Sequence, residues 1–286
     1  GASTQFAMAP MNLALDGKPM LYADTGAWTS KAMKEAKLFG DVKAVYSGKE
    51  GNYTKIGDPD DWDWSGEASY AYLCSNNTIF GTQYRTFPAT GDTPLIADMS
   101  SDIFSRVVDG NQFGVIFAGA QKNLGPAGVT LVVIRKDLAE RVKATVPTML
   151  KYTTHIEKDS AFNTPPTFAI YVVGLVLDWI KEQGGLASVE KINNTKSGSL
   201  YSVIDNSDFY LGTAEPADRS HMNVTFRLAN TDLESTFVAE AKEAGLIGLK
   251  GHRSVGGIRA SIYNAMPLAG VSTLVDFMHE FERKNG

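Results

Sequence analysis

One stretch decides how this chain folds: Gly119-Ala120-Gln121-Lys122-Asn123-Leu124-Gly125-Pro126-Ala127-Gly128. It joins two strongly apolar runs, residues 113–118 and 129–134, which have the composition of buried strands. The stretch is therefore expected to be a turn at the edge of a sheet. A lysine held in such a turn can form a Schiff base when local electrostatics make its neutral amine available. Lys122 is a candidate for that chemistry, although a lone lysine in a loop is usually a plain surface residue.

Strand-like and helix-like segments alternate around this turn, which predicts parallel strands with crossover helices. The expected strands span residues 20–23, 42–46, 69–74, 94–98, 113–118 and 129–135. The clearest helical periodicity covers residues 29–39, and Pro165 and Pro166 begin a long apolar helix that runs to residue 181. The sequence thus predicts an α/β fold in which a large domain, residues 1–188, holds a mostly parallel sheet.

The pattern of predicted helices and strands changes near residue 189. From there the pattern is compact α+β, with strands expected near residues 223–228, 245–249 and 257–263 and helices near 233–244 and 271–284. We predict that residues 189–286 form a smaller C-terminal domain. The polar segment 48–65 is expected to be an excursion between two strands, and its aspartates are assigned to a surface loop without a metal.

Composition excludes several classes of protein. Of 286 residues, 43% are hydrophobic and 21% are charged, which is ordinary for a soluble globular protein with a large core. The net charge of −5 and the lack of a basic stripe argue against nucleic-acid binding. The most apolar run, residues 168–180, is too short for a bilayer, and no secretory signal opens the chain. The single cysteine, Cys74, fits a reducing compartment, so a cytoplasmic location is expected.

Asp98 ends the apolar run 94–97, twenty-four residues before Lys122. Ligands of open α/β sheets bind at the carboxyl ends of the strands. By itself such an aspartate is more often a turn or cap residue. Paired with a lysine at the end of the next strand, it predicts a site for pyridoxal 5'-phosphate (PLP), in which the aspartate keeps the pyridine nitrogen protonated and the lysine carries the cofactor.

Five ordered blocks of sequence resemble the phosphoserine aminotransferase family over nearly the whole chain. They are Gly1-Ala2-Ser3-Thr4-Gln5-Phe6, Ile96-Ala97-Asp98-Met99-Ser100-Ser101, the Lys122 stretch, Asn163-Thr164-Pro165-Pro166-Thr167-Phe168, and residues 251–261 with the sequence GHRSVGGIRAS. The resemblance implies a fold-type-I PLP transferase. It also implies a homodimer whose active sites lie at the interface between subunits.

The resemblance assigns roles residue by residue. Lys122 and Asp98 would be catalytic and would bind PLP. The other matching cofactor positions are Ala2, Ser3, Trp28, Thr78 and Gln121, with Asn163 and Thr164 reaching the cofactor phosphate of the other subunit. Without the resemblance, these seven have plain interpretations as cap, core-anchor or turn residues.

The segment 252–259 carries the groups expected to bind substrate. Arginine binds carboxylates and phosphates through two parallel hydrogen bonds, so two arginines and a histidine this close suit a substrate with both groups. By resemblance, Arg259 would hold the α-carboxylate, while His252 and Arg253 contact a distal phosphate. Isolated arginines are more often solvated or in structural ion pairs. His155, His221 and His279 lack metal-ligand spacing, so no metal is expected.

The implied reaction moves an amino group between L-glutamate and 3-phosphohydroxypyruvate, giving O-phospho-L-serine and 2-oxoglutarate in serine biosynthesis. Some members of the family also use a phosphorylated threonine analogue on the pyridoxine pathway. The chain begins inside the phosphate-binding block, so we expect several tens of N-terminal residues of the family to be missing, with weak or no activity as one consequence. The alternatives are another fold-type-I aminotransferase, or a catalytically silent fragment of the enzyme.

Overall fold

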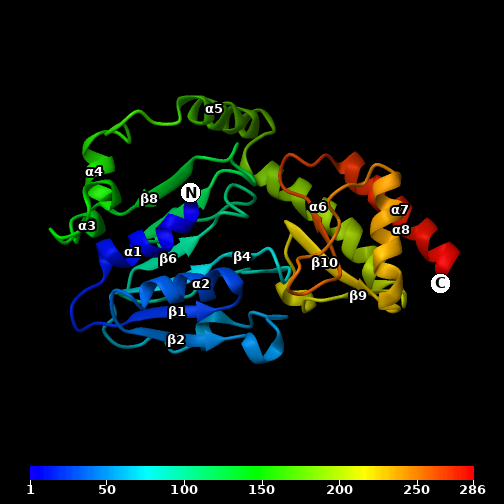
Figure 1. Cartoon of the computed structure of the whole chain (residues 1–286), viewed down its shortest axis with the longest axis horizontal. Helices are drawn as coiled ribbons and strands as arrows, with labels where there is room; N and C mark the ends of the chain where they lie inside the picture. The colour runs from blue at the N-terminus through cyan, green and yellow to red at the C-terminus, as the bar shows by residue number, and fades with distance from the viewer.

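The computed structural model describes residues 1–286, and its chain forms two bodies side by side (Figure 1). The larger body is built on a six-stranded sheet, the smaller one on a three-stranded sheet. The six strands of the larger body are β1 (Met20–Asp24), β2 (Val42–Ser47), β3 (Tyr70–Cys74), β6 (Leu95–Asp98), β7 (Val115–Gly119) and β8 (Thr130–Ile134). All six strands predicted for this part of the chain are therefore confirmed within one or two residues at most boundaries.

The large sheet has the order β2-β1-β3-β6-β7-β8. Neighbouring strands from β2 to β7 pair in parallel, but β8 runs antiparallel to β7. The Lys122 stretch is thus the connection of an antiparallel pair, which needs only a short link because the chain reverses directly. The mostly parallel α/β fold predicted from the sequence is confirmed.

Each strand sends alternate side chains into two separate cores, as the period of two requires. On one face, Tyr22, Tyr72 and Phe117 pack beneath the helices α1 (Gln5–Leu13) and α2 (Ala27–Ala36) and the shorter α3 (Lys136–Ala139) and α4 (Tyr152–Glu157). On the other face, Leu73 and Ala97 pack against the excursion after β2, the loop after β5 and the inner side of α5 (Thr167–Glu182). Because both faces are covered, the central strands β1, β3, β6 and β7 are buried along their whole length.

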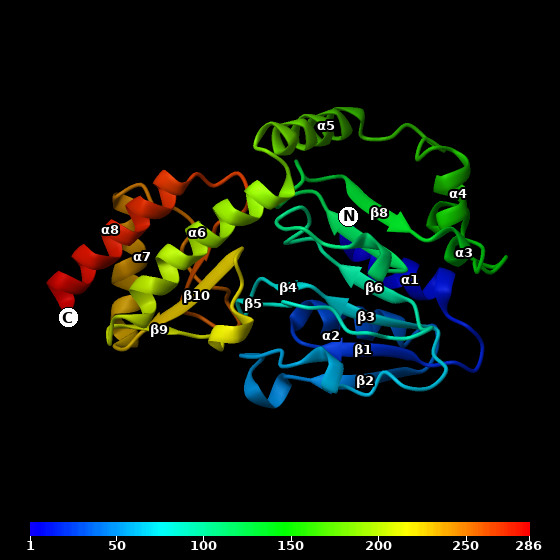
Figure 2. The same ribbon diagram turned by 180° about the vertical axis from the view of Figure 1, so that it is seen from behind.

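Helix α5 lies along the outside of the large body (Figures 1 and 2). Only Ile180 among its sixteen residues is buried, although the helix is strongly apolar. Phe168 keeps 76% and Tyr171 keeps 63% of the side-chain surface exposed, and Ile170 and Leu175 are exposed beside them. This surface, which we call the α5 apolar face, is larger than isolated exposed hydrophobic residues explain.

The smaller body has its own core. Helices α6 (Leu186–Asp205), α7 (Glu234–Glu243) and α8 (Leu268–Asn285) contribute to it with an antiparallel sheet of order β11-β10-β9. These strands are β9 (Tyr210–Gly212), β10 (Asn223–Leu228) and β11 (Ile258–Ser261). The predicted boundary at residues 188/189 falls in the first turn of α6 and stays a prediction.

One predicted strand of the smaller body is wrong. Residues 245–249 form a loop, in which Gly245 and Gly248 have φ angles of 84° and 80°. These left-handed conformations are incompatible with a strand. The third strand of the sheet is instead β9, which the sequence did not reveal because it has only three residues.

A hairpin connects the two bodies. Strands β4 (Asn76–Asn77) and β5 (Thr82–Gln83) carry a tip that touches β10 (Figure 2). Thr225 Oγ1 donates to the backbone oxygen of Phe80, and a Cβ on Gly81 would lie only 2.1 Å from Thr225 Oγ1. Gly81, with φ of 76°, is therefore required for this close approach. None of the helices is both long and apolar enough to cross a membrane.

Candidate active site

The carboxyl edge of the large sheet brings together residues that are far apart in the sequence. Asp98 is the last residue of β6, and it pairs in register with Phe117 of β7, two residues before that strand ends. The turn that follows β7 is closed by hydrogen bonds from the backbone nitrogens of Leu124 and Gly125 to the oxygen of Ala120. Lys122 lies in this turn, so both residues occupy the edge where α/β sheets bind ligands.

Lys122 is half-buried and free of polar partners. Its Nζ forms no hydrogen bond and no ion pair, and it lies 5.5 Å from the centroid of the Trp28 ring. Trp28 is the second residue of α2, and its indole nitrogen donates to Thr78 Oγ1 over 3.1 Å. The ring is thus fixed in orientation beside an amine that is available for reaction.

Asp98 lies almost entirely out of solvent, with 5% of its surface exposed. The backbone nitrogen of Ser100 donates to its Oδ1 over 2.9 Å. Burial raises the pKa of Asp98, while the bond with Ser100 and the charge of Lys122 pull that pKa down. The structure therefore places a buried carboxylate within electrostatic reach of the lysine, as the sequence predicted for these two residues.

The N-terminus of the chain lies against the same edge. A Cβ added to Gly119, the last residue of β7, would lie 3.2 Å from the Cβ of Ala2. Ala2 belongs to a short 3-10 helix, Ala2–Thr4, that leads directly into α1. Ser3 and Gln121 are exposed here, and neither side chain forms a hydrogen bond. Free backbone N–H groups at a helix start, together with a serine hydroxyl, can bind a phosphate.

The predicted substrate residues reach the site from the smaller body. Arg259, on β11, donates from Nη1 to the backbone oxygen of Thr78 over 3.0 Å. Its charge, with that of Arg253, helps burial to lower the pKa of His252. Arg253 itself is exposed. His252 and Arg259 line a cavity of about 630 Å³ together with Tyr53, Phe80 and thirteen further residues.

Two residues of this region escaped the sequence interpretation. Lys31 lies with Nζ 4.3 Å from the centroid of the Trp28 ring and acts electrostatically on His252. Its position one helical turn after Trp28 was the available signal. Tyr53, in a left-handed conformation with φ of 57°, packs against Phe80 with ring centroids 4.7 Å apart. Nothing local in the sequence indicates that this loop residue enters the cavity.

Asn163 and Thr164 lie apart from this group. Both are exposed in the segment just before α5, and neither side chain bonds to another predicted site residue. Within one chain the structure therefore unites ten of the twelve predicted site residues around the sheet edge and its facing loops. No group of three histidine, cysteine or carboxylate side chains is arranged to hold a metal ion.

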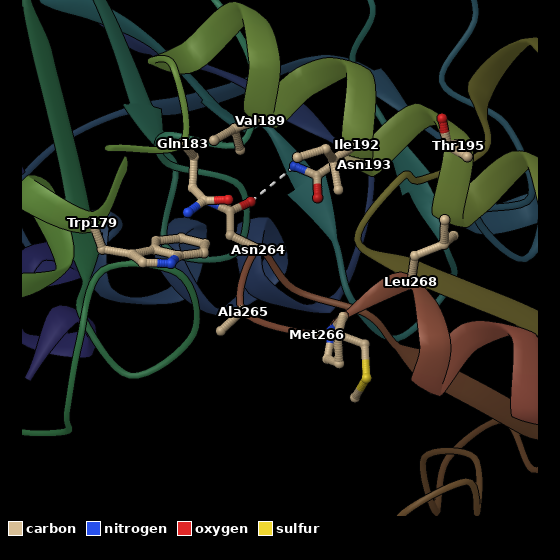
Figure 3. Close-up of a pocket in the computed structure, with 11 residues that line it drawn as sticks. Trp179, Gln183, Val189, Ile192, Asn193, Thr195, Asn264, Ala265, Met266 and Leu268 are labelled. Atoms are coloured by element: carbon tan, nitrogen blue, oxygen red, sulfur yellow. Dashed lines mark hydrogen bonds between the residues drawn. The ribbon is translucent and has the colours of Figure 1, made fainter. Parts of the chain in front are cut away.

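Asparagines tie the Lys122 turn to the smaller body. Asn123 Oδ1 accepts from the backbone nitrogen of Asn264 over 3.0 Å, and Asn264 Oδ1 accepts from Asn193 Nδ2 over 2.8 Å. Figure 3 shows the second of these bonds in the wall of a cavity of about 500 Å³, between the end of α5, α6 and residues 264–268. The residue next to the candidate nucleophile is thus anchored by both bodies.

Comparisons with known proteins agree with this geometry. The family model for class-V aminotransferases matches residues 1–274. The chain is 57% identical to a phosphoserine aminotransferase of Desulfatibacillum aliphaticivorans, over 100% of this chain and 79% of that protein. Its fold is similar to that of the phosphoserine aminotransferase of Bacillus circulans subsp. alkalophilus, with a TM-score of 0.98, 51% identity, and coverage of 100% of this chain and 80% of that one.

A PLP-bound phosphoserine aminotransferase of Trichomonas vaginalis is also similar, with a TM-score of 0.91 and 38% identity, covering 98% of this chain and 80% of that one. The fold and the sheet-edge site define a class-V aminotransferase, in which a lysine and a buried aspartate meet at the carboxyl ends of the strands. Within that class, the chain belongs to the phosphoserine aminotransferase family.

Proposed function

We propose that this chain transfers an amino group between L-glutamate and 3-phosphohydroxypyruvate with PLP as cofactor, giving O-phospho-L-serine and 2-oxoglutarate for serine biosynthesis. The observation that carries the proposal is the unpartnered amine of Lys122, held beside the Trp28 ring and in electrostatic contact with buried Asp98.

The residues at the sheet edge fit PLP. Lys122 Nζ would hold the aldehyde carbon, Asp98 the pyridine nitrogen, and the Trp28 ring one face of the cofactor ring. Thr78 and Gln121 would contact the cofactor, and the backbone of Ala2 with the hydroxyl of Ser3 would bind its phosphate. Bound PLP supplies a conjugated ring that accepts the electron pair of a broken Cα–H bond.

Different residues of the chain would bind the two ends of the substrate and move the proton. Arg259 fixes the substrate α-carboxylate, and its Nη1 bond to the Thr78 oxygen limits where that carboxylate can lie. His252 and Arg253 attract the distal phosphate at the other end of the substrate. Lys122 Nζ would take the proton from the substrate α-carbon and deliver it to the C4′ carbon of the bound cofactor, while ionised Asp98 would stabilise positive charge on the ring nitrogen.

The active form is proposed to be a homodimer with shared active sites. The α5 apolar face would be covered by a second copy of the chain, because this one helix exposes Phe168, Ile170, Tyr171 and Leu175. Asn163 and Thr164, exposed just before α5, would then reach the partner's cofactor phosphate. A cytoplasmic location is proposed as well, since Cys74 is buried and unpaired.

A spectroscopic experiment tests the proposal. Purified protein mixed with PLP is expected to develop a visible absorption band. Borohydride reduction should abolish this band and leave the cofactor covalently attached to Lys122, which peptide mass spectrometry locates. Lys34→Ala, an exposed substitution on α2, should behave as the wild type. Labelling at another lysine, or none, would contradict the proposed cofactor site.

Turnover assays separate the remaining functions. Production of 2-oxoglutarate from L-glutamate and 3-phosphohydroxypyruvate, but not with an unphosphorylated keto acid, is the expected result. Equal rates with the unphosphorylated acid would favour another fold-type-I aminotransferase. A PLP band without any turnover would favour a catalytically silent fragment.

A further inference from the structure

Asn123 follows Lys122 directly, and the roles proposed above leave its side chain without a function. The residue is almost completely buried, with 5% of its surface exposed. Its Oδ1 accepts from the backbone nitrogen of Asn264 over 3.0 Å. Breaking this bond would leave a buried N–H group without a partner, which is costly. The residue next to the candidate nucleophile is therefore held by a bond from outside its own turn.

The nitrogen of the Asn123 carboxamide makes two weaker contacts. Nδ2 lies 3.5 Å from the backbone oxygen of Ser101 and 3.5 Å from Sδ of Met222. Ser101 lies three residues after Asp98 in the larger body, and Met222 directly precedes β10 in the smaller one. The first contact is at the outer limit of hydrogen bonding, and a thioether sulfur is a weak acceptor. The bond to Asn264 is thus the strongest polar contact of this side chain.

The segment that supplies this bond also carries Arg259. Arg259 lies on β11, five residues before Asn264. The residues between them are held firmly, because Lys196 Nζ donates to the backbone oxygens of Ile262 and Tyr263 over 3.0 and 2.9 Å. The N–H group bonded to Asn123 therefore has a fixed place relative to the arginine proposed to hold the α-carboxylate.

A second path leads from Arg259 back to the lysine. Arg259 Nη1 donates to the backbone oxygen of Thr78, whose Oγ1 accepts from the indole nitrogen of Trp28. The Trp28 ring centroid lies 5.5 Å from Lys122 Nζ. Together with the bond of Asn123, these contacts form a closed ring around the candidate cofactor site. The lysine amine and the arginine guanidinium are thus tied to each other from two sides.

We propose that Asn123 is a positioning residue for proton transfer, which sets where the Lys122 amine lies relative to the substrate α-carbon by bonding the segment that carries Arg259. The proposal rests on the function proposed above. A substrate whose carboxylate is bound by Arg259 has its α-carbon in a defined place, so the amine must be fixed in the same frame. A misplacement of about 1 Å can lower the rate of such a step about 10²-fold.

The test compares the kinetics of PLP-loaded wild type and Asn123→Ala. We expect kcat to fall about 10- to 100-fold, because the amine is no longer held in register with the α-carbon. KM for L-glutamate should change less than about threefold, since Arg259 is untouched. The isotope effect on kcat, measured with L-glutamate deuterated at the α-carbon, should rise because proton transfer becomes the slower step. An isotope effect that does not rise would overturn the proposal.

Asn12→Ala is the matched control. Asn12, in α1, is 2% exposed, and its Oδ1 likewise accepts from a distant backbone nitrogen, that of Tyr152, over 3.1 Å. This variant should lose thermal stability but keep the wild-type kcat and isotope effect. If it changed both as Asn123→Ala does, the effect would reflect a general loss of packing and the positioning role would be contradicted.

Two further substitutions isolate the bond to Asn264. Asn123→Asp keeps an acceptor oxygen at the same distance from the backbone, so kcat should stay within about fivefold of the wild type. A loss equal to that of Asn123→Ala would contradict the role of this bond. Asn123→Ser, whose oxygen lies one bond closer to the backbone, replaces the alanine variant if that variant does not fold. It should show the same raised isotope effect, and an unchanged one would overturn the proposal.

Amide hydrogen exchange of the apoprotein separates this proposal from the proposed function. The backbone nitrogens of Leu124 and Gly125 donate to the oxygen of Ala120, and they should exchange faster in Asn123→Ala because their turn has lost an anchor. Unchanged exchange would overturn the proposal. If wild-type protein formed no band with PLP, the proposed function would fail, while exchange would still show whether Asn123 fixes the turn. A normal wild-type band and turnover with unaltered variant kinetics would overturn the role of Asn123 alone.

Discussion

Two buried or half-buried lysines of this protein have opposite surroundings. Lys196, on α6, is 0% exposed and donates from Nζ to the backbone oxygens of Ile262, Tyr263 and Met266 at 2.9 to 3.1 Å. Lys122, in the turn after β7, has no polar partner at all within the chain. Both side chains have lost much of their contact with water, but only Lys196 has protein hydrogen bonds in place of the lost bonds to water.

The difference indicates what each lysine is for. Three carbonyl oxygens occupy the three donors of the Lys196 ammonium, so its nitrogen is unavailable for chemistry even though burial lowers its pKa to about 8. The lysine fastens the loop 262–266, which carries Asn264 and through it the Lys122 turn. A depressed pKa alone would have pointed to Lys196, whereas a half-buried amine without partners agrees with the role proposed for Lys122.

The largest expected effect comes from removing Lys122. Lys122→Ala should lower kcat by about 10³-fold or more, because the amine that moves the proton is lost. Its thermal stability should stay near that of the wild type, since the side chain makes no hydrogen bond. Steady-state kinetics and thermal denaturation measure both. A fully active Lys122→Ala would show that Lys122 is not the reactive lysine and would contradict the difference in role proposed for the two lysines.

Replacing Lys196 should produce the reverse pattern. Lys196→Met retains the apolar stem but leaves three carbonyl oxygens without their donor, which should cost about 2 to 4 kcal/mol of unfolding free energy. Urea denaturation measures the loss, and the PLP band of the remaining folded protein should persist. Unchanged stability would mean that the loop 262–266 is held by other contacts.

The neighbourhood of Lys196 also predicts how stability depends on pH. Burial, with the charges of Arg85 and Arg106, lowers the pKa of His221 from 6.5 to about 4. Between these values the unfolded chain binds a proton that the folded chain does not, so stability falls as pH drops from 6.5 towards 4, by up to about 3 kcal/mol. His221→Gln should flatten this dependence in urea denaturation at pH 7 and 4.5. Parallel losses in both proteins would show that other groups cause it.

The smallest effect is expected on the Lys122 side. Trp28→Phe keeps an aromatic ring beside the lysine but removes the indole donor to Thr78 Oγ1. One neutral hydrogen bond contributes about 1 kcal/mol, so PLP affinity should fall roughly fivefold. Absorbance titration with PLP measures it. A loss as large as that of Trp28→Ala would show that orientation of the ring matters more than its presence.

Local signals were sufficient for the strands of the large sheet. Apolar runs such as 70–74 predicted their own burial. Asp98 could be placed at a strand end because it directly follows such a run, and Lys122 because it lies in the short glycine-rich turn after another. The strand predicted at 245–249 failed, because the sequence pattern did not show that two glycines there adopt left-handed conformations. The reversal of β8 was also hidden, since strand direction depends on pairing rather than composition.

What the sequence by itself determined was the α/β class, the strand ends and most of the candidate site. These follow from short-range hydrophobic patterns and from blocks of residues that resemble one family. Only the tertiary structure decided which polar groups are satisfied. That Lys196 has three partners and Lys122 none depends on atoms brought together from distant segments. Hydrogen bonding acts over a few ångströms in space, and sequence separation carries no record of it.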